Sequence, residues 1–243
     1  MKYRILPLLL LVCLALYGCK EEAAPAAGTV PTASPTLAPT ATETAPAETE
    51  PPILMYPGAI EDYLLPLEKF SWVTPYQPEY VMLHFTSAVM LDPEDPYDYA
   101  MNRQIFVDNE VSIHYLVDWE GAVYCFIPED RAAWHAGEGT FANDPKYTNK
   151  MNFHSIGIEI MGIGSYHDMA EYMDEEAYNA LDPALIGFTD AQYETLRLLI
   201  ADICQRYGIP TDRSHVIGHS DFSPDKTDPG ELLDWERLLS SGE

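Results

Sequence analysis

The sequence predicts an α/β fold of mixed α+β character, in which helices flank a central mixed β-sheet. Short runs of strand-forming residues alternate with helical patterns along the chain. Residues 53–243 hold enough aliphatic and aromatic side chains for one core, and their number suits one domain. We therefore expect a single domain over residues 53–243.

The first half of this domain is expected to contain a strand, a helix and a hairpin. Residues 80–85 are rich in strand formers, which places His84 near the carboxyl end of a strand. A short helix is expected within residues 97–107. Two strand-like runs, 111–118 and 122–127, lie either side of a short turn and predict a β-hairpin.

Residues 154–161 predict a strand with two different faces. Three isoleucines share one face, and Ser155, Gly157 and Glu159 share the other. A carboxylate in so apolar a strand is costly unless it is solvated or paired, so Glu159 is a candidate functional group. The alternative is a glutamate on an ordinary exposed sheet face.

The second half is expected to be mostly helical. Thr189 and Gln192 fit a capping box that opens a helix, and apolar residues recur at helical spacing over residues 196–207. A short strand over residues 214–217 and a closing helix over residues 231–239 complete the fold.

The amino-terminal residues predict export. A basic start precedes an apolar run over residues 5–17, which is too short for a membrane span of about 20 residues. We interpret residues 1–18 as a signal peptide that ends in a motif resembling the lipobox of bacterial lipoproteins, so Cys19 is the expected lipidation site. Ordinary secretion and an uncleaved anchor are the alternatives.

Residues 19–52 predict a tether between this lipid anchor and the domain. They are mostly Ala, Pro, Thr and Glu with almost no large apolar residue, so they cannot form a core. Extended at roughly 3.1 Å per residue, they would reach up to about 100 Å. We expect an extracytoplasmic protein, anchored to a bacterial membrane and within reach of a cell wall.

The charge and the cysteines narrow the choice of partners and of crosslinks. The formal net charge is −26, and loss of residues 1–18 removes Lys2 and Arg4 and leaves −28. Such an acidic surface argues against nucleic acid as a partner. Outside the cytoplasm Cys125 and Cys204 have the option of pairing, but the apolar patterns around both favour core positions.

The polar loop over residues 218–230 carries the strongest chemical signal. Its prolines and glycines argue against a continuous helix or strand, and it presents His219, Asp228 and Lys226 close together in sequence. An imidazole and a carboxylate are zinc ligands. The chain lacks the common local zinc signatures, so any site must be assembled from distant segments, with His84 as a candidate.

Five motifs in order resemble one family. They are His84 after its strand, Val111-Ser112-Ile113-His114-Tyr115, Ala133-Trp134-His135-Ala136-Gly137, Ser155-Ile156-Gly157-Ile158-Glu159 and the 218–230 loop. Over residues 75–240 the chain resembles the type-2 N-acetylmuramoyl-L-alanine amidases, of the superfamily that includes peptidoglycan-recognition proteins.

The resemblance implies a zinc ion held by His84, His219 and Asp228, in a cleft at the strand ends. It gives Glu159 the role of general base and proton shuttle, in the branch of the family that lacks a tyrosine near the position of Ile113. Lys226 matches the lysine that steadies the oxyanion.

The resemblance also suggests that His135 contacts substrate, while Trp134 offers an apolar wall for a sugar or peptide. Packing of their loop is the alternative for both. His114 is interpreted as a core residue or a supporter of the site. The other histidines, 154, 167 and 215, are interpreted as structural or exposed.

The expected reaction is hydrolysis of the amide between N-acetylmuramic acid and the L-alanine of the stem peptide, with peptidoglycan or muropeptides as substrate and a monomeric enzyme. A non-catalytic peptidoglycan-binding module and a zinc peptidase that cuts within the stem peptide are the alternatives. The segment 162–187 is longer than a strand-to-helix link needs, and a lid, a specificity loop and an acidic flap all remain open for it.

Overall fold

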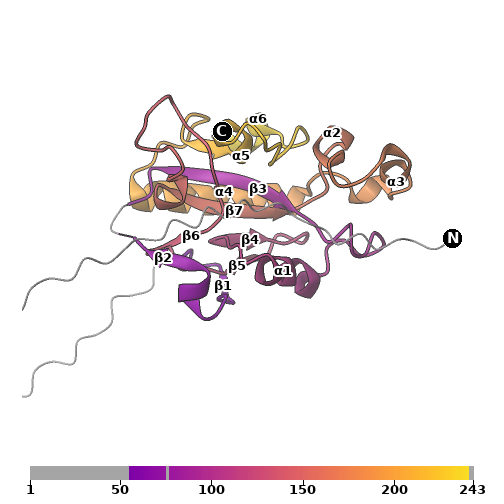
Figure 1. The fold of residues 1–243 in the computed structure, drawn as a ribbon, viewed down its shortest axis with the longest axis horizontal. Coiled ribbons are helices and arrows are strands. Elements are labelled where there is room, and N and C mark those ends of the chain that lie inside the picture. Colours follow the sequence, from indigo (N-terminus) through magenta and orange to yellow (C-terminus); the bar gives the residue numbers. More distant parts are fainter. Residues whose placement is uncertain (1–54, 75–76, 241–243) are drawn as a thin grey trace, which may run out of the picture. The chain divides into compact units, whose positions relative to one another are not determined.

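A six-stranded mixed sheet organises the domain (Figure 1). The computed structural model describes residues 55–74 and 77–240, and the predicted signal peptide, Cys19 and tether lie outside these residues. The strands, in their order across the sheet, are β1 (Ile60–Glu61), β5 (Val123–Cys125), β4 (Tyr115–Val117), β7 (Ser155–Met161), β3 (Tyr80–Thr86) and β8 (Val216–Gly218). Only β4 and β5 pair antiparallel, so the predicted mixed sheet is confirmed.

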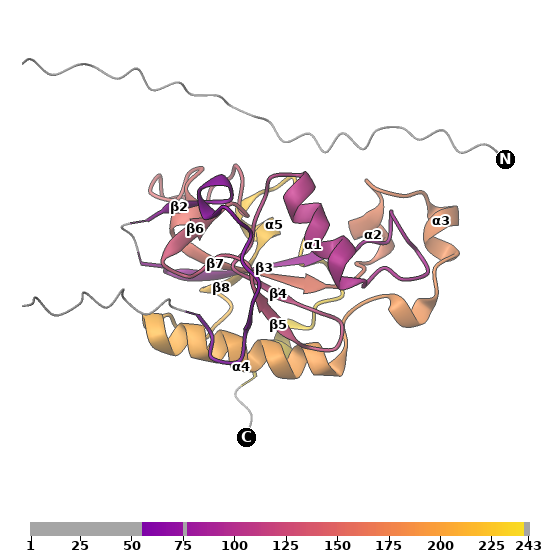
Figure 2. The same cartoon turned by 90° about the horizontal axis from the view of Figure 1, so that it is seen from below.

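Helices cover both faces of this sheet. Figure 2 shows α4 (Asp190–Tyr207) along one face and α1 (Tyr99–Asp108) on the other. The alternation of side chains in β3 and β7 turns Val81, Leu83 and the three isoleucines of β7 into the core beneath α4. The opposite side chains of these two strands, including His84 and Glu159, are therefore directed to the other face.

The central helix begins and ends as its sequence predicts. Thr189 Oγ1 accepts the Gln192 amide hydrogen at 3.1 Å, and Gln192 Oε1 accepts that of Thr189 at 2.9 Å. Gly208 ends the helix with φ +68°, a left-handed conformation that favours glycine. Cys204 lies on its buried side, and Cys125 is buried in the same core; both are free thiols.

Three expected elements differ in detail. The first hairpin strand is shorter than predicted, because Ser112 bonds instead to the carbonyl of Trp134, outside the sheet. The 218–230 loop begins with one helical turn, α5 (His219–Phe222), and the closing helix α6 starts only at Trp235. A second, two-stranded sheet of β2 (Ser71–Val73) and β6 (Arg131–Ala133) was not predicted.

The segment 162–187 is ordered and packed against the domain. It contains α2 (Tyr166–Met169), α3 (Glu175–Asn179) and the 3-10 helix η3 (Pro183–Leu185). Its apolar side chains pack against Phe85 and Val89, which follow His84 in the chain. Within the part of the chain that the structure describes, no helix is both long and apolar enough to cross a membrane.

Candidate metal centre

The sheet register brings His84 and Glu159 side by side. They are paired residues on the adjacent parallel strands β3 and β7, so their side chains leave the same face next to each other. Gly218, at the end of β8, pairs with Leu83 of β3, and His219 follows it directly. Two strands and the start of α5 thus deliver three functional side chains to one place near the strand ends.

The loop after α5 folds back and adds Asp228. The Ser220 amide donates to the Asp228 carbonyl at 3.0 Å, which closes the loop. Asp228 Oδ2 lies 2.7 Å from His84 Nδ1 and 3.1 Å from His219 Nδ1. One ligand atom from each of the three residues lies within 4.8 Å of the others, as binding of one metal ion requires.

The hydrogen bonds of His219 decide what its Nδ1 presents to the carboxylate. Its Nε2 lies 3.0 Å from the Ala136 carbonyl oxygen, which can only accept, so Nε2 carries the hydrogen. In a neutral His219, Nδ1 then offers a lone pair to the Asp228 carboxylate. Two acceptors this close need a cation between them, either a proton or a metal ion. Two imidazole nitrogens and a carboxylate oxygen fit zinc.

The charges of the cluster are strongly coupled. Burial by itself would raise the pKa of Asp228, but the protons that the His219 and His84 rings share with its carboxylate outweigh burial and hold this pKa well below its ordinary value. Burial lowers the pKa of His84. The structure thus favours the ionised carboxylate that a metal site needs.

Glu159 faces this cluster without a bonded partner of its own. Burial and the negative charge of Asp228 raise the pKa of Glu159 well above its ordinary value, and Lys226 opposes them. Among the described residues no hydrogen bond or ion pair engages its carboxylate. A strongly perturbed and unbonded carboxylate beside a ligand cluster is typical of a group that transfers protons.

Lys226 contributes a positive charge to the same place. Its side chain is exposed, and its charge acts on both Glu159 and His84. Its backbone amide donates to the Ser223 carbonyl at 3.1 Å, so a hydrogen bond within the loop fixes the backbone at this residue.

Comparison with known proteins identifies the family. The model of the N-acetylmuramoyl-L-alanine amidase family, Amidase_2, matches residues 74–231. The chain belongs to this family. The three residues of the cluster lie within the matched range, and so do Glu159 and Lys226.

Individual proteins to which the chain is similar are also amidases by name. It is 35% identical over 132 residues to the 1,6-anhydro-N-acetylmuramyl-L-alanine amidase AmpD of Haemophilus influenzae. The aligned residues cover 54% of the chain and 58% of that relative. It is 31% identical over 129 residues to AmpD of Escherichia coli K12, covering 53% and 56%. The chain thus spans less than two thirds of the length of these curated relatives.

Solved structures share the fold. A selenomethionine AmpD derivative superposes with a TM-score of 0.53 at 23% identity, covering 76% of this chain and 94% of that one. A complex of the E. coli amidase AmiD with anhydro-N-acetylmuramic acid-L-Ala-D-γ-Glu-L-Lys superposes with a TM-score of 0.50 at 27% identity, covering 67% and 57%.

The structure places the remaining candidates of this amidase-family chain around the cluster. His135 Nδ1 lies 3.0 Å from His84 Nε2. Trp134 packs on Trp72 with ring centroids 5.0 Å apart, so its indole belongs to an aromatic cluster on the small sheet. His114 is fully buried, where its Nδ1 accepts the Gly157 amide hydrogen and its Nε2 donates to the Arg131 carbonyl.

The other three histidines have different partners. His154 Nδ1 lies 2.9 Å from Glu79, and His215 Nδ1 lies 2.8 Å from Asp212. The side chain of His167 is 71% exposed. None of the three belongs to the candidate ligand group, as the sequence interpretation expected.

The segment 162–187 also reaches the site, which the sequence did not reveal. Asp168 in α2 is buried and accepts the backbone hydrogen of Glu231 at 3.1 Å, just beyond Asp228 in the chain. Burial and the charges of Glu171, Asp228 and Glu159 raise the pKa of Tyr172. The only early signal was the length of the segment.

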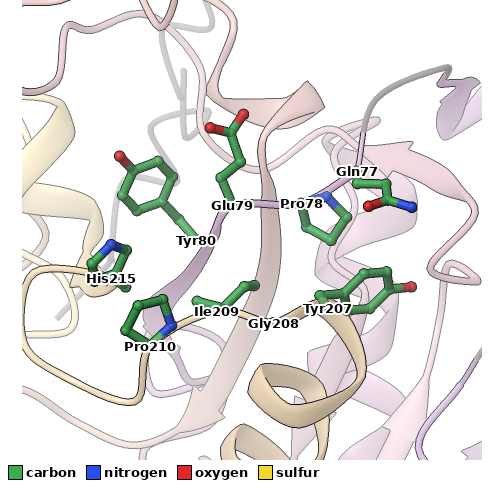
Figure 3. A pocket seen from close by; sticks show the side chains of 9 residues that line it. All are labelled: Gln77, Pro78, Glu79, Tyr80, Tyr207, Gly208, Ile209, Pro210 and His215. Carbon is green, nitrogen blue, oxygen red and sulfur yellow. The ribbon is translucent and has the colours of Figure 1, made fainter.

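A separate pocket lies at the other end of β3 from the candidate metal centre. Figure 3 shows its lining from the start of β3, including Glu79 and Tyr80, and from the end of α4 and the residues beyond, including Pro210 and His215. None of the candidate ligands lines it. Tyr80 is four residues from His84 along β3, or roughly 13 Å, so this pocket is distinct from the metal centre.

Proposed function

We propose that the chain is a zinc-dependent N-acetylmuramoyl-L-alanine amidase, which hydrolyses the amide between N-acetylmuramic acid and the L-alanine of the stem peptide. The observation that carries the proposal is the cluster of His84, His219 and Asp228 with Glu159 beside it. Membership of the amidase family and the names of the relatives support the substrate class.

Zinc held by His84, His219 and Asp228 would polarise the amide carbonyl and lower the pKa of bound water. In this proposal the ionised Glu159 takes a proton from the attacking water and delivers it to the departing amine. Its raised pKa makes it a stronger proton acceptor than an ordinary carboxylate, which suits the first half of this transfer.

Lys226 would stabilise the negative charge that develops on the carbonyl oxygen. An ammonium group favours the tetrahedral state over the uncharged substrate, so its contribution appears mainly in the transition state. The exposed loop position leaves this side chain free to approach substrate.

The proposal also covers the substrate and the location of the protein in the cell. We take the substrate to be peptidoglycan or its muropeptides, bound in a cleft at the strand ends by a monomer, with Trp134 as an apolar wall. Residues 1–52 support an extracytoplasmic lipoprotein anchored through Cys19. Release of the protein from the membrane fraction by Cys19→Ala tests the anchor, and unchanged membrane retention would contradict it.

The reaction is tested by mass spectrometry of the products from purified peptidoglycan and from soluble anhydromuropeptides. The proposal predicts intact stem peptides with a free L-alanine amino group, and none after chelation of the metal. Fragments cut within the stem would support a zinc peptidase instead. Binding to peptidoglycan with no new product would support a non-catalytic module.

A further inference from the structure

The two imidazoles of the cluster are both held through their outer nitrogens by one segment, residues 134–137. We propose that His135 is a positioning residue that fixes the tautomer of His84, so that His84 Nδ1 is free to bind the metal. This inference rests on the proposed zinc function and assigns His135 a task other than contact with substrate. The Ala136 carbonyl performs the same task for His219.

The direction of the hydrogen bonds starts at Ser155. Its hydroxyl donates to the Met151 carbonyl at 2.8 Å, a shorter contact than the 3.4 Å between Ser155 Oγ and His135 Nε2. Since the single hydroxyl hydrogen is used on the carbonyl, the serine oxygen acts as an acceptor toward His135. His135 therefore carries its hydrogen on Nε2.

The consequence passes through the ring of His135 to His84. A neutral imidazole has one N–H and one lone pair, so His135 Nδ1 is the acceptor. It lies 3.0 Å from His84 Nε2, which must then donate. His84 Nδ1 is left with its lone pair, 2.7 Å from Asp228 Oδ2. A ligand whose other nitrogen is fixed in this way is oriented before the metal arrives.

The surrounding chain holds His135 in place for this role. Asn152 Oδ1 accepts the backbone hydrogens of His135 and Ala136 at 3.0 and 2.7 Å. Gly157 lies beneath the imidazole, where an added Cβ would come within 2.7 Å of its Cγ. The glycine between the isoleucines of β7 is therefore needed for the ring to approach His84.

The engagement of both ring nitrogens separates this role from substrate binding. His135 Nδ1 faces His84 and Nε2 faces Ser155, so neither nitrogen is left for a substrate group in this arrangement. A positioning role predicts a change in zinc affinity. A role in substrate binding predicts a change in KM with zinc affinity unaltered.

The test measures zinc affinity of the full domain by competition with a chromophoric chelator. The variants are His135→Ala, His135→Asn and Ser155→Ala. Ser71→Ala is the matched control, because Ser71 is an equally buried serine whose hydroxyl donates to the Leu67 carbonyl and accepts from Arg131, away from residues 134–137.

We expect His135→Ala to weaken zinc binding by about 10- to 100-fold, the usual effect of losing such a supporting group. Ser155→Ala should weaken it less, and Ser71→Ala should leave it unchanged. His135→Asn should recover part of the loss, because its amide oxygen replaces the Nδ1 acceptor. Affinities of His135→Ala and Ser71→Ala that agree within twofold would overturn the inference.

A second measurement does not depend on variants that fold. Imidazole nitrogen NMR of the metal-free wild-type protein should show a hydrogen on His84 Nε2, whether or not a proton also occupies Nδ1 beside Asp228. A hydrogen on Nδ1 with Nε2 bare would contradict the inference. A wild-type protein that binds no zinc would instead overturn the proposed function, so the two failures are distinguishable.

Discussion

Two carboxylates of this domain, the buried Glu129 and the partly buried Asp228, have opposite surroundings. Glu129 accepts hydrogen bonds from both Arg206 and the hydroxyls of Tyr115 and Tyr207, so every neighbour is a donor. Asp228 faces two imidazole nitrogens, and the outer nitrogen of each ring is engaged elsewhere.

The difference teaches how to tell a structural carboxylate from a ligand. Burial by itself would raise the pKa of Glu129, but Arg206 and Tyr115 outweigh it and hold this pKa below its ordinary value. The arginine supplies the balancing charge, so the group is complete without any ion. In the Asp228 cluster the lone pairs of two imidazole nitrogens and of the carboxylate face one another, so a cation is needed between them.

The largest expected effect comes from Glu159, the proposed proton carrier beside His84, His219 and Asp228. Glu159→Gln should lower turnover by about 10²- to 10⁴-fold, because the amide cannot accept the proton. Zinc content should not change. Glu194→Gln, at an exposed position of α4, is the control. Turnover near that of wild type would remove Glu159 from the mechanism.

The second prediction compares the stability of the two clusters in metal-free protein. Glu129→Gln should lower the free energy of unfolding by about 1–3 kcal/mol, because the neutral amide replaces a buried carboxylate that accepts charge-assisted hydrogen bonds from Arg206 and from the hydroxyls of Tyr115 and Tyr207. Asp228→Asn should change it by about 1 kcal/mol or less, because the new amide can donate to an imidazole lone pair. Urea unfolding with a chelator present measures both, and equal losses would erase the comparison.

Lys226 should affect catalysis without affecting the ligands. Lys226→Met should lower kcat/KM by about 10²- to 10³-fold, as loss of an oxyanion partner does, at unchanged zinc affinity. Lys150→Met, another exposed loop lysine, is the matched control. A loss of zinc together with activity would mean that Lys226 acts on the metal site instead.

The smallest expected effect is a pH dependence of the stability that Glu129 and its hydrogen-bond partners contribute. The pKa of Glu129 is lower in the folded protein than its unfolded value of about 4.3, so its contribution to stability is present above that pH and is lost as pH falls. The difference in unfolding free energy between wild type and Glu129→Gln should therefore narrow below about pH 4. A constant difference down to pH 3 would contradict this assignment.

Local patterns account for what the sequence could predict. The alternation in β7 separated Glu159 from the isoleucines, and the capping box located the start of α4. The ligand set came from the resemblance, since no spacing rule joins His84 to residues more than a hundred positions away.

Contacts between distant segments account for what it could not predict. Arg206 and Glu129 are 77 positions apart, and nothing local marks them as partners. The hydrogen bonds of His135 depend on Asn152 and Ser155, which come from other parts of the chain. The hydrogen bond between Asp168 and the backbone of Glu231 depends on how the segment 162–187 folds.

The most direct test of the central claim is zinc affinity compared between the two carboxylates. Chelator competition should show one zinc ion per chain in the wild type, the same affinity in Glu129→Gln, and at least about tenfold weaker binding in Asp228→Asn. Wild-type protein without stoichiometric zinc, or an Asp228→Asn variant that binds zinc as tightly as wild type, would contradict the account.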